Sequence, residues 1–336
     1  MATLEAAARP AVVAVAASAG GVEALSGFVS ALPADFPATA LIVLHIPPAG
    51  PSVLPTILSR AGKLPARHPI DGERLTEGVI LVAPPDRHMT VSHHHVHVLA
   101  GPRENGHRPA ADVLLRSVAE NFGYRGAGVV LSGTMDDGAA GLRAIGAVGG
   151  LTLAQDPAEA AFPGMPLAAI EEADPQVVGA VDILADHVCR WLTDLSETPP
   201  EISMTASEEA GAADPADLPL TCPECGGILG HRRDYGAQRF RCRAGHTFSA
   251  DGLLLGKQAA LESALWAAIA APEVRADVSR RIATRLEETG RIPRSDRYRH
   301  DVLAAENRAE ALRGLIRELV QGASMSYDED NIGDTA

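Results

Sequence analysis

Between residues 11 and 195, short apolar segments alternate with segments long enough to form helices, and this alternation constrains the fold more than any other feature of the chain. The apolar segments are almost continuous in Val, Ile, Leu and Ala, which is typical of strands buried on both faces of a parallel sheet. We therefore predict an α/β domain with a doubly wound, mostly parallel sheet. Residues 86–99 alternate between polar and apolar side chains, so an antiparallel hairpin is expected there as an insertion. The expected strands are 11–17, 39–45, 79–83, 127–132, 151–154 and 177–181, and the expected helices are 21–31, 51–60, 109–121, 138–147 and 182–193.

The composition changes after residue 195. Residues 201–220 carry several acidic side chains and no Lys or Arg, and prolines lie at 199, 200 and 215. This composition is typical of a solvated linker. We expect this linker to leave the segments that follow it independent of the α/β domain. A new helix is expected to open at Pro272. The expected divisions are an α/β domain at 11–195, an acidic flexible linker at 196–220, a zinc-binding module at 221–249, a helical segment at 250–322 and a disordered acidic tail at 323–336.

Ser18 follows the first expected strand and stands directly before an expected helix, within the sequence AASAGG. A serine on a sharp turn from strand to helix exposes its hydroxyl at the carboxyl edge of a sheet. The backbone N–H groups of Ala19 and Gly20 then point from the helix N-terminus towards a developing oxyanion. Two other interpretations are a glycine-rich turn with no chemical role and a dinucleotide-binding turn. The second requires G-x-G-x-x-G and an acidic residue at the end of the next strand, whereas here the glycines are misplaced and that strand ends in His45.

His45 and a pair of aspartates are expected at the same edge of the sheet as Ser18. His45 ends the second expected strand, and Asp136 and Asp137 lie in the loop after the strand 127–132. A histidine there can simply be packed in the core, and paired aspartates before a helix are often caps. Beside a serine, however, an imidazole and a carboxylate are the parts of a hydrolytic triad, in which the carboxylate orients the imidazole.

Six stretches of the sequence, in this order, resemble the chemotaxis protein-glutamate methylesterase (CheB) family over about residues 11–195. The resemblance implies that Ser18 is the nucleophile, that His45 is the general base and then the general acid, and that Asp137 is the orienting carboxylate, with Asp136 as a bystander. It also implies that catalysis needs no cofactor. The stretches are ASAGGVEAL, IVLHIPP, ILVAPPDRHMTV, HRPAADVLLRSVAE, GVVLSGTMDDGAAGL and AQDPAEAAFPGMPLAAI.

The sequence departs from the family pattern in the loop before Asp137. Thr134 stands where the family has a methionine whose backbone N–H contributes to the oxyanion hole, and Met135 stands in place of a glycine. The geometry of the oxyanion hole is therefore expected to differ more than the triad. The best-known members also carry an N-terminal phospho-receiver domain, which we expect to be absent because only about ten residues precede the first strand. In the family the region of Arg108 lies beside the active site, so this side chain is a candidate to steer an acidic substrate.

The cysteines of the C-terminal third have metal-ligand spacing. Cys222 and Cys225 form C-x₂-C, and Cys242 and His246 form C-x₃-H, a pattern that predicts tetrahedral Zn²⁺. Four protein ligands leave no open position, so the predicted site is structural. Unrelated thiols are the other interpretation, and His231 is an alternative fourth ligand. The remaining cysteine, at 189, is expected in the core.

The resemblance implies a serine hydrolase that removes methyl esters from glutamate side chains of chemoreceptor-like proteins and also deamidates glutamine. The expected partner is a methylated chemoreceptor or receptor-like protein, with a further, unidentified partner for the C-terminal region. The formal charge of −14 argues against nucleic acid as a partner. No apolar run approaches the roughly 20 residues of a spanning helix, so membrane insertion is not expected. The cysteine usage favours the cytoplasm. Two other functions remain open: a catalytically weak adaptor that docks partners through its C-terminal region, and an esterase for another acylated substrate.

Overall fold

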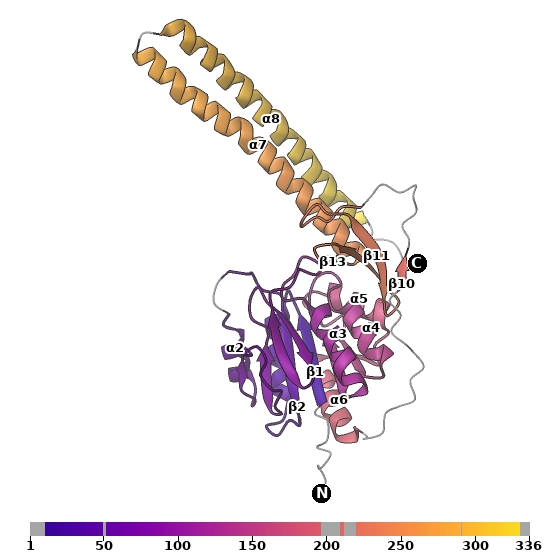
Figure 1. The fold of residues 1–336 in the computed structure, drawn as a ribbon. Coiled ribbons are helices and arrows are strands. Elements are labelled where there is room, and N and C mark those ends of the chain that lie inside the picture. Colours follow the sequence, from indigo (N-terminus) through magenta and orange to yellow (C-terminus); the bar gives the residue numbers. More distant parts are fainter. Residues whose placement is uncertain (1–10, 50–51, 196–208, 212–219, 290, 330–336) are drawn as a thin grey trace. The chain divides into compact units, whose positions relative to one another are not determined.

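The structure, a computed structural model, describes residues 11–49, 52–195, 209–211, 220–289 and 291–329. The chain divides into two compact units, Met1–Gly256 and Lys257–Ala336. The first unit contains the sheet and the cysteine-rich segment, and the second contains most of a helical hairpin (Figure 1).

The first unit is built on a seven-stranded sheet in which every pairing is parallel. The strand order is β3-β4-β2-β1-β7-β8-β9, so the chain winds outward from β1 in one direction and later returns beside it to wind outward in the other. This doubly wound topology confirms the predicted fold class, and it puts the point of reversal between β1 and β7, where open α/β sheets bind ligands. The strands are β1 (Ala11–Ala17), β2 (Ala38–Leu44), β3 (Ala66–Arg67), β4 (Val79–Val82), β7 (Gly126–Val130), β8 (Leu151–Gln155) and β9 (Val177–Gly179).

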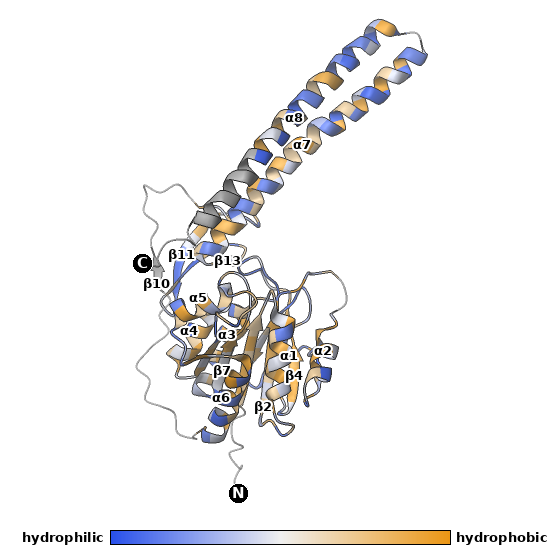
Figure 2. Cartoon of the chain, turned by 180° about the vertical axis from the view of Figure 1, so that it is seen from behind, coloured by the Kyte–Doolittle hydropathy of each residue, from blue (hydrophilic) through white to orange (hydrophobic). Residues whose placement is uncertain are grey.

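Helices cover both faces of the sheet because its central strands are apolar on both sides. All seven residues of β1 are buried, and they alternate between two cores: Val13 and Val15 belong to one and Val12 to the other. Figure 2 shows the hydrophobic strands lying between the helical layers. The first core is closed by α1 (Gly21–Ala31), α2 (Leu54–Ala61) and α6 (Val181–Asp194). The second is closed by α3 (Ala111–Phe122), α4 (Ala139–Ala147), α5 (Gly164–Ala173) and the hairpin of β5 (His88–Ser92) and β6 (His95–Leu99), with a 3-10 turn at Gly123–Arg125.

The cysteine-rich segment folds as an antiparallel sheet within the same unit. Its strands are β10 (Glu209–Gly211), β11 (Leu229–Asp234), β12 (Ala237–Cys242) and β13 (Thr247–Phe248). Strand β10 falls inside the expected linker, of which 196–208 and 212–219 lie outside the described residues.

The expectation that the linker leaves this module independent of the α/β domain is wrong. Arg143 of α4 donates a hydrogen bond from Nε to the carbonyl oxygen of Tyr235, at 2.7 Å. Arg239 of β12 forms an ion pair with Asp112 of α3, and both side chains are almost fully buried. Two buried charges of opposite sign require each other, so this contact holds the module on the domain.

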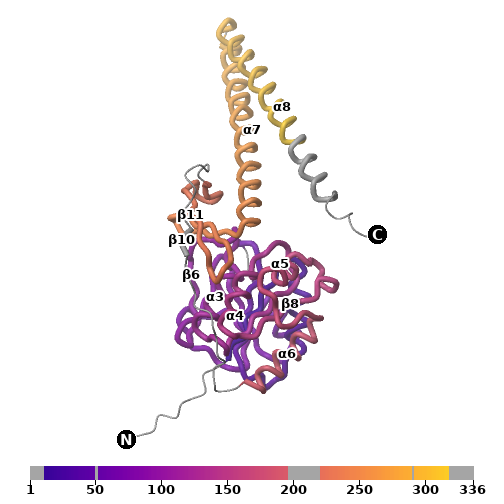
Figure 3. The backbone as a smooth tube through the Cα atoms, turned by 90° about the vertical axis from the view of Figure 1, so that its right-hand side faces the viewer, coloured from indigo at the N-terminus to yellow at the C-terminus, as the bar shows by residue number. Residues whose placement is uncertain are grey.

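The C-terminal helices are α7 (Ala250–Glu288) and α8 (Ile292–Glu329), which run antiparallel (Figure 3). The expected helix start at Pro272 is wrong, because this proline lies inside α7. A proline in a helix interior costs about 3 kcal/mol, and contacts between the helices offset this cost. Ile269 packs against α8, and Arg275 pairs with Asp301 at 3.0 Å. Helix α8 continues past the start of the expected tail, and 330–336 lies outside the described residues.

Neither of these helices, nor any other in the described ranges, combines the length and the apolar character needed to cross a bilayer.

Candidate functional site

Ser18 lies on a tight turn between β1 and α1. Its backbone N–H donates to the carbonyl oxygen of Ser132 at 2.9 Å, and its own carbonyl accepts the N–H of Gly21, also at 2.9 Å. Gly20 between them has φ +68°, and a Cβ there would lie 2.8 Å from Ser132 Oγ. Only glycine fits this position, so the small residues around Ser18 are what allow the sharp turn.

His45 lies beside this turn because β1 and β2 are paired in register. Ala17 pairs with Leu44, so Ser18 and His45 are each the next residue after a paired position. The His45 N–H donates to the carbonyl oxygen of Ala17 at 3.2 Å. The carboxyl ends of neighbouring parallel strands meet at one edge, and the two side chains predicted from sequence therefore share that edge.

Asp137 completes the group from the loop after β7. Its Oδ2 lies 2.7 Å from His45 Nε2, and it also accepts the N–H of Ala111 at 2.7 Å, while Oδ1 accepts the N–H of Asp112 at 3.1 Å. Burial alone would raise the pKa of the Asp137 carboxyl, but the hydrogen bond and the charge of His45 hold that pKa well below its ordinary value. Asp137 is therefore a carboxylate, and the proton between the two residues belongs to His45 Nε2.

This arrangement leaves Nδ1 as the basic nitrogen of His45. In the part of the chain that the structure describes, the buried Nδ1 has no hydrogen-bond partner. An unpaired buried acceptor is costly, and catalytic sites are among the places where such atoms persist. An imidazole oriented by a carboxylate, with its second nitrogen free at the sheet edge that also bears a serine, has the parts needed to accept a proton from a hydroxyl.

The predicted oxyanion donors lie on the two turns that face each other. Among the described residues, the N–H groups of Ala19, Gly20 and Thr134 make no hydrogen bond, so all three are available to a ligand. Met135 has φ +69°, in the left-handed region where a glycine would be unstrained. The loop therefore keeps the backbone conformation that suits glycine although a methionine stands there.

Sequence reasoning missed His107, which stacks on His45. Their ring centroids lie 3.8 Å apart with an angle of 2° between the ring planes. Burial, and then repulsion from His45, lower the pKa of His107 to about 4, so this ring is neutral near neutral pH. The signal in the sequence was only a histidine before a helix, and nothing in that pattern indicates a partner ring.

A cleft of about 310 Å³ opens beside these rings, and its lining includes His45, His107, Arg103 and Arg108. Arg108 is largely committed within the chain: Nε and Nη2 donate to Asp86 Oδ1 at 3.0 and 2.7 Å, and Nη1 donates to the carbonyl oxygen of Gly101. Its predicted role in steering a substrate stays a prediction, and Arg103 is a second cation at the same cleft.

The cysteine-rich module brings together the four predicted metal ligands. Ligand atoms of Cys222, Cys225, Cys242 and His246 all lie within 4.8 Å of one another. The Sγ atoms of Cys225 and Cys242 are 3.6 Å apart, and His246 Nδ1 lies 3.5 Å from Cys242 Sγ. Tetrahedral Zn²⁺ with Zn–S bonds of about 2.3 Å separates two sulfurs by about 3.8 Å, and a disulfide would need about 2.0 Å.

These donors therefore fit a zinc ion. His231, the alternative ligand, is not among the four, and its ring lies against Phe240. Cys189 packs at the edge of the first core, as expected.

Comparison with known proteins places the first unit in a family. The family described as CheB methylesterase matches residues 13–188. A protein-glutamate methylesterase/protein-glutamine glutaminase of Anaeromyxobacter dehalogenans is 42% identical over 183 residues, 54% of this chain and 54% of that protein. One of Koribacter versatilis is 39% identical over 177 residues, 52% of this chain and 49% of that protein.

A solved structure is also similar. The catalytic domain of the CheB methylesterase of Thermotoga maritima matches with a TM-score of 0.52 at 27% sequence identity, covering 54% of this chain and 98% of that domain. A serine at a strand end, with a histidine–aspartate pair at the same edge of the sheet, is the set of groups that serine hydrolases use. The chain belongs to the CheB methylesterase family. It spans about half the length of the curated relatives it matches, and the residues that match the family end before the cysteine-rich module.

Proposed function

We propose that the chain hydrolyses methyl esters on glutamate side chains of a methylated chemoreceptor or receptor-like protein, and that it also deamidates glutamine. The observation that carries the proposal is the 2.7 Å contact of His45 with the buried Asp137, at the strand edge that also bears Ser18. The names of the similar proteins supply the substrate class.

In the proposed mechanism Ser18 Oγ attacks the carbonyl carbon of the side-chain ester while His45 Nδ1 takes the hydroxyl proton. Asp137 stabilises the imidazolium, and N–H groups of Ala19 and Thr134 bind the oxyanion. His45 then returns the proton to the leaving group, which departs as methanol, or as ammonia from an amide. A water molecule, deprotonated by His45, hydrolyses the acyl-serine and releases glutamate.

The test is Ser18→Ala, assayed by mass spectrometry of methylated receptor peptides and by labelling with a fluorophosphonate probe. Loss of a triad nucleophile typically lowers kcat by about 10⁴- to 10⁶-fold. Ser30→Ala is the matched control, because Ser30 lies exposed on α1 and bonds only within that helix. If Ser18→Ala keeps more than about a tenth of the activity, the nucleophile assignment is wrong, and if it keeps the full cellular function, the chain works as an adaptor. Hydrolysis of small esters without any action on receptor peptides would point to another acylated substrate.

We further propose that Cys222, Cys225, Cys242 and His246 hold a structural zinc ion that does not itself contact the substrate or the reacting atoms. Structural zinc supplies on the order of 10 kcal/mol of folding free energy in small modules. The module needs such help because its own core contains few large side chains. Its free thiols also fit a reducing compartment, which supports a cytoplasmic location.

Metal analysis of the purified chain should give one zinc per chain, and the double variant Cys222→Ser/Cys225→Ser should contain none. Cys189→Ser is the matched control and should retain the metal, because this cysteine lies at the edge of the other core. A chain that is folded throughout the module yet free of metal would contradict the assignment.

A further inference from the structure

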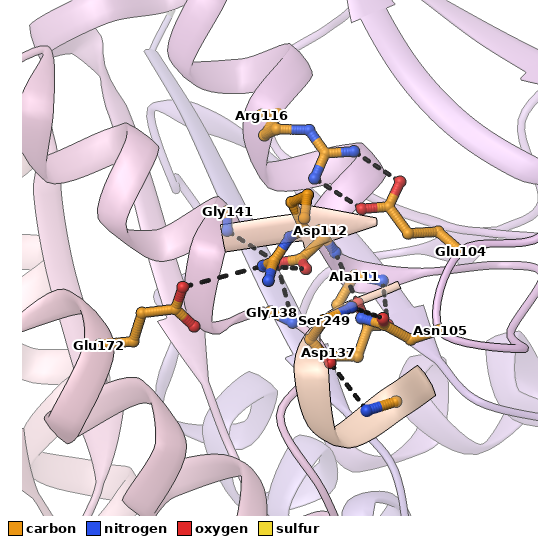
Figure 4. Close-up of polar contacts among 12 residues, drawn as sticks. Glu104, Asn105, Ala111, Asp112, Arg116, Asp137, Gly138, Gly141, Glu172 and Ser249 are labelled. Atoms are coloured by element: carbon orange, nitrogen blue, oxygen red, sulfur yellow. Dashed lines mark hydrogen bonds and ion pairs between the residues drawn. The ribbon is translucent and has the colours of Figure 1, made fainter. Parts of the chain in front are cut away.

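Asp112 of α3 forms hydrogen bonds with Asp137 and with the first turn of α4. Its carboxylate Oδ1 accepts the N–H groups of Gly138 at 3.1 Å and of Gly141 at 2.7 Å, which fixes the first turn of α4 directly after Asp137. Its own N–H donates to Asp137 Oδ1 at 3.1 Å. In Figure 4 the dashed lines join Asp112 to Gly138 and Gly141. The position of the carboxylate that orients His45 therefore depends on Asp112.

The charge of Asp112 is balanced from outside the family domain. Asp112 is fully buried, and its Oδ2 accepts a hydrogen bond of 3.0 Å from Nη2 of Arg239, whose side chain is 2% exposed. Burial raises the pKa of Asp112 to about 7, although Arg239 acts to lower it. Removing the partner of a buried ion leaves an uncompensated charge, and the structure then has to rearrange or take up a proton.

The cysteine-rich module also forms hydrogen bonds with residues 103–105, which precede His107. Asn105 donates its N–H to the carbonyl oxygen of Thr247 at 2.8 Å, and its side-chain Oδ1 accepts the N–H of Ser249 at 2.8 Å. Thr247 in turn donates its N–H to the carbonyl oxygen of Arg103 at 3.3 Å. Figure 4 shows Ser249 beside Asn105. The module thus contacts two parts of the α/β domain that adjoin the His45–Asp137 pair: Asp112, which bonds to Asp137, and residues 103–105, which precede His107.

The predicted metal ligands lie next to these contact residues. Arg239 and Cys242 share β12, and Thr247 directly follows His246. The turn between the two ligands is closed by the N–H of Cys242, which donates to the carbonyl oxygen of His246 at 3.1 Å. A metal bound at these ligands would fix the backbone on which Arg239 and Thr247 are carried.

We propose that Arg239 is a positioning residue of the esterase site, acting through Asp112 on Asp137, and that metal in the cysteine-rich module holds Arg239 in place. The inference rests on the proposed function and adds its regulation: hydrolysis is efficient only while the module is metal-loaded and docked. In the described part of the chain the Arg239 side chain bonds to Asp112, Glu172 and the Gln238 carbonyl, and none of its bonds goes to His45.

Arg239→Gln tests the first half in the full-length, zinc-loaded chain. Misplacement of a catalytic group by about 1 Å costs on the order of 10²-fold in rate, so we expect kcat to fall roughly 10- to 100-fold while KM changes little. Fluorophosphonate labelling of Ser18 should slow by a similar factor. Arg233→Gln is the matched control, because Arg233 is an exposed arginine on β11 of the same hairpin.

Two further variants separate positioning from loss of folding. Arg239→Lys keeps the charge and should restore part of kcat. The double variant Arg239→Met/Asp112→Asn removes both charges but keeps a side-chain oxygen that can accept the N–H groups of Gly138 and Gly141. It should recover kcat to within a few-fold of the wild type. A double variant no better than Arg239→Gln would overturn the route through Asp112.

Hydrogen exchange tests the metal dependence without relying on activity. Peptides covering 103–112 and 136–142 should exchange at least about tenfold faster after zinc is removed by a chelator, and readdition of Zn²⁺ alone should reverse this. Arg239→Gln should show the same faster exchange at 136–142 with zinc bound. Equal exchange with and without zinc, or a kcat of Arg239→Gln within twofold of wild type, would overturn the inference. A wild-type chain that neither reacts with the fluorophosphonate probe nor hydrolyses esters would instead contradict the proposed function. The exchange data would then test only whether metal and Arg239 order residues 103–112 and 136–142.

Discussion

Lowering the pH from about 7.5 to about 4.5 should destabilise the first unit through His107. This ring has a pKa of about 4 in the folded chain against an ordinary value of 6.5, so it is neutral in the fold over a range in which the unfolded chain binds a proton. Above pH 6.5 the ring is neutral in both the folded and the unfolded chain, so its titration costs no stability. As the pH falls from 6.5 to about 4, the unfolded chain binds a proton that the folded chain does not, and the stability falls. Applied to these two values, linkage gives a loss of about 2.5 kcal/mol between the two pH values.

The comparison with His107→Gln isolates this effect from the other titrating groups. The free energy of unfolding of each chain would be measured in urea at several pH values, in a Trp266→Phe background. Trp191, which packs at the edge of the first core, then reports on the α/β domain. The stability difference, wild type minus variant, should fall by about 2.5 kcal/mol from about pH 7.5 to about pH 4.5. A difference that stays constant within about 0.5 kcal/mol would refute the conclusion that His107 is buried as a neutral ring against His45.

Three other outcomes are expected. Met135→Gly should raise the free energy of unfolding, measured in urea, by about 0.5 kcal/mol, because the gain from relieving a left-handed methionine exceeds the added backbone entropy of the unfolded chain. An unchanged or lower free energy of unfolding would show that Met135 is not strained. Gly133→Ala should lower the rate of ester hydrolysis at least about tenfold, since the added Cβ would overlap Met165 Sδ and lie 2.9 Å from Ser18 Cβ. The control Gly146→Ala should have little effect on this rate, because its Cβ would lie 3.5 Å from the nearest atom. Truncation after residue 195 removes Arg239, so turnover of a small ester should fall as it does in Arg239→Gln. Full activity of the truncated chain would contradict the positioning role of Arg239.

The parts of the site that the sequence predicts are those set by strand ends. An apolar run that ends in Ser18 and another that ends in His45 are expected at one edge, because parallel strands are buried and aligned, and the structure brings these residues together. The boundaries of α1 and β1 are as predicted for the same reason: Gly20 and Gly21 leave only one place for the turn.

The contacts that the sequence does not predict join distant segments or offset a local penalty. Arg239 reads as an ordinary arginine of a solvated hairpin, since its partner Asp112 lies 127 positions away in the chain. His107 depends in the same way on where a loop places it relative to His45. Pro272 predicts a helix start from local chemistry alone, and the ion pairs and apolar contacts with α8 that keep α7 continuous cannot be seen locally.

The separation between Asp112 and Arg239 also bears on the order in which the protein is made. A ribosome adds about 5 to 20 residues per second, so the sheet, α3 and α4 leave it several seconds before Arg239 does. During this interval the α/β domain can assemble with a buried carboxylate that has no cation beside it. Contacts that close such long loops also form late when a denatured chain refolds. Docking of the β11–β12 hairpin is therefore expected to be the last event in maturation, and a nascent chain would acquire an ordered site only once its C-terminal third has emerged.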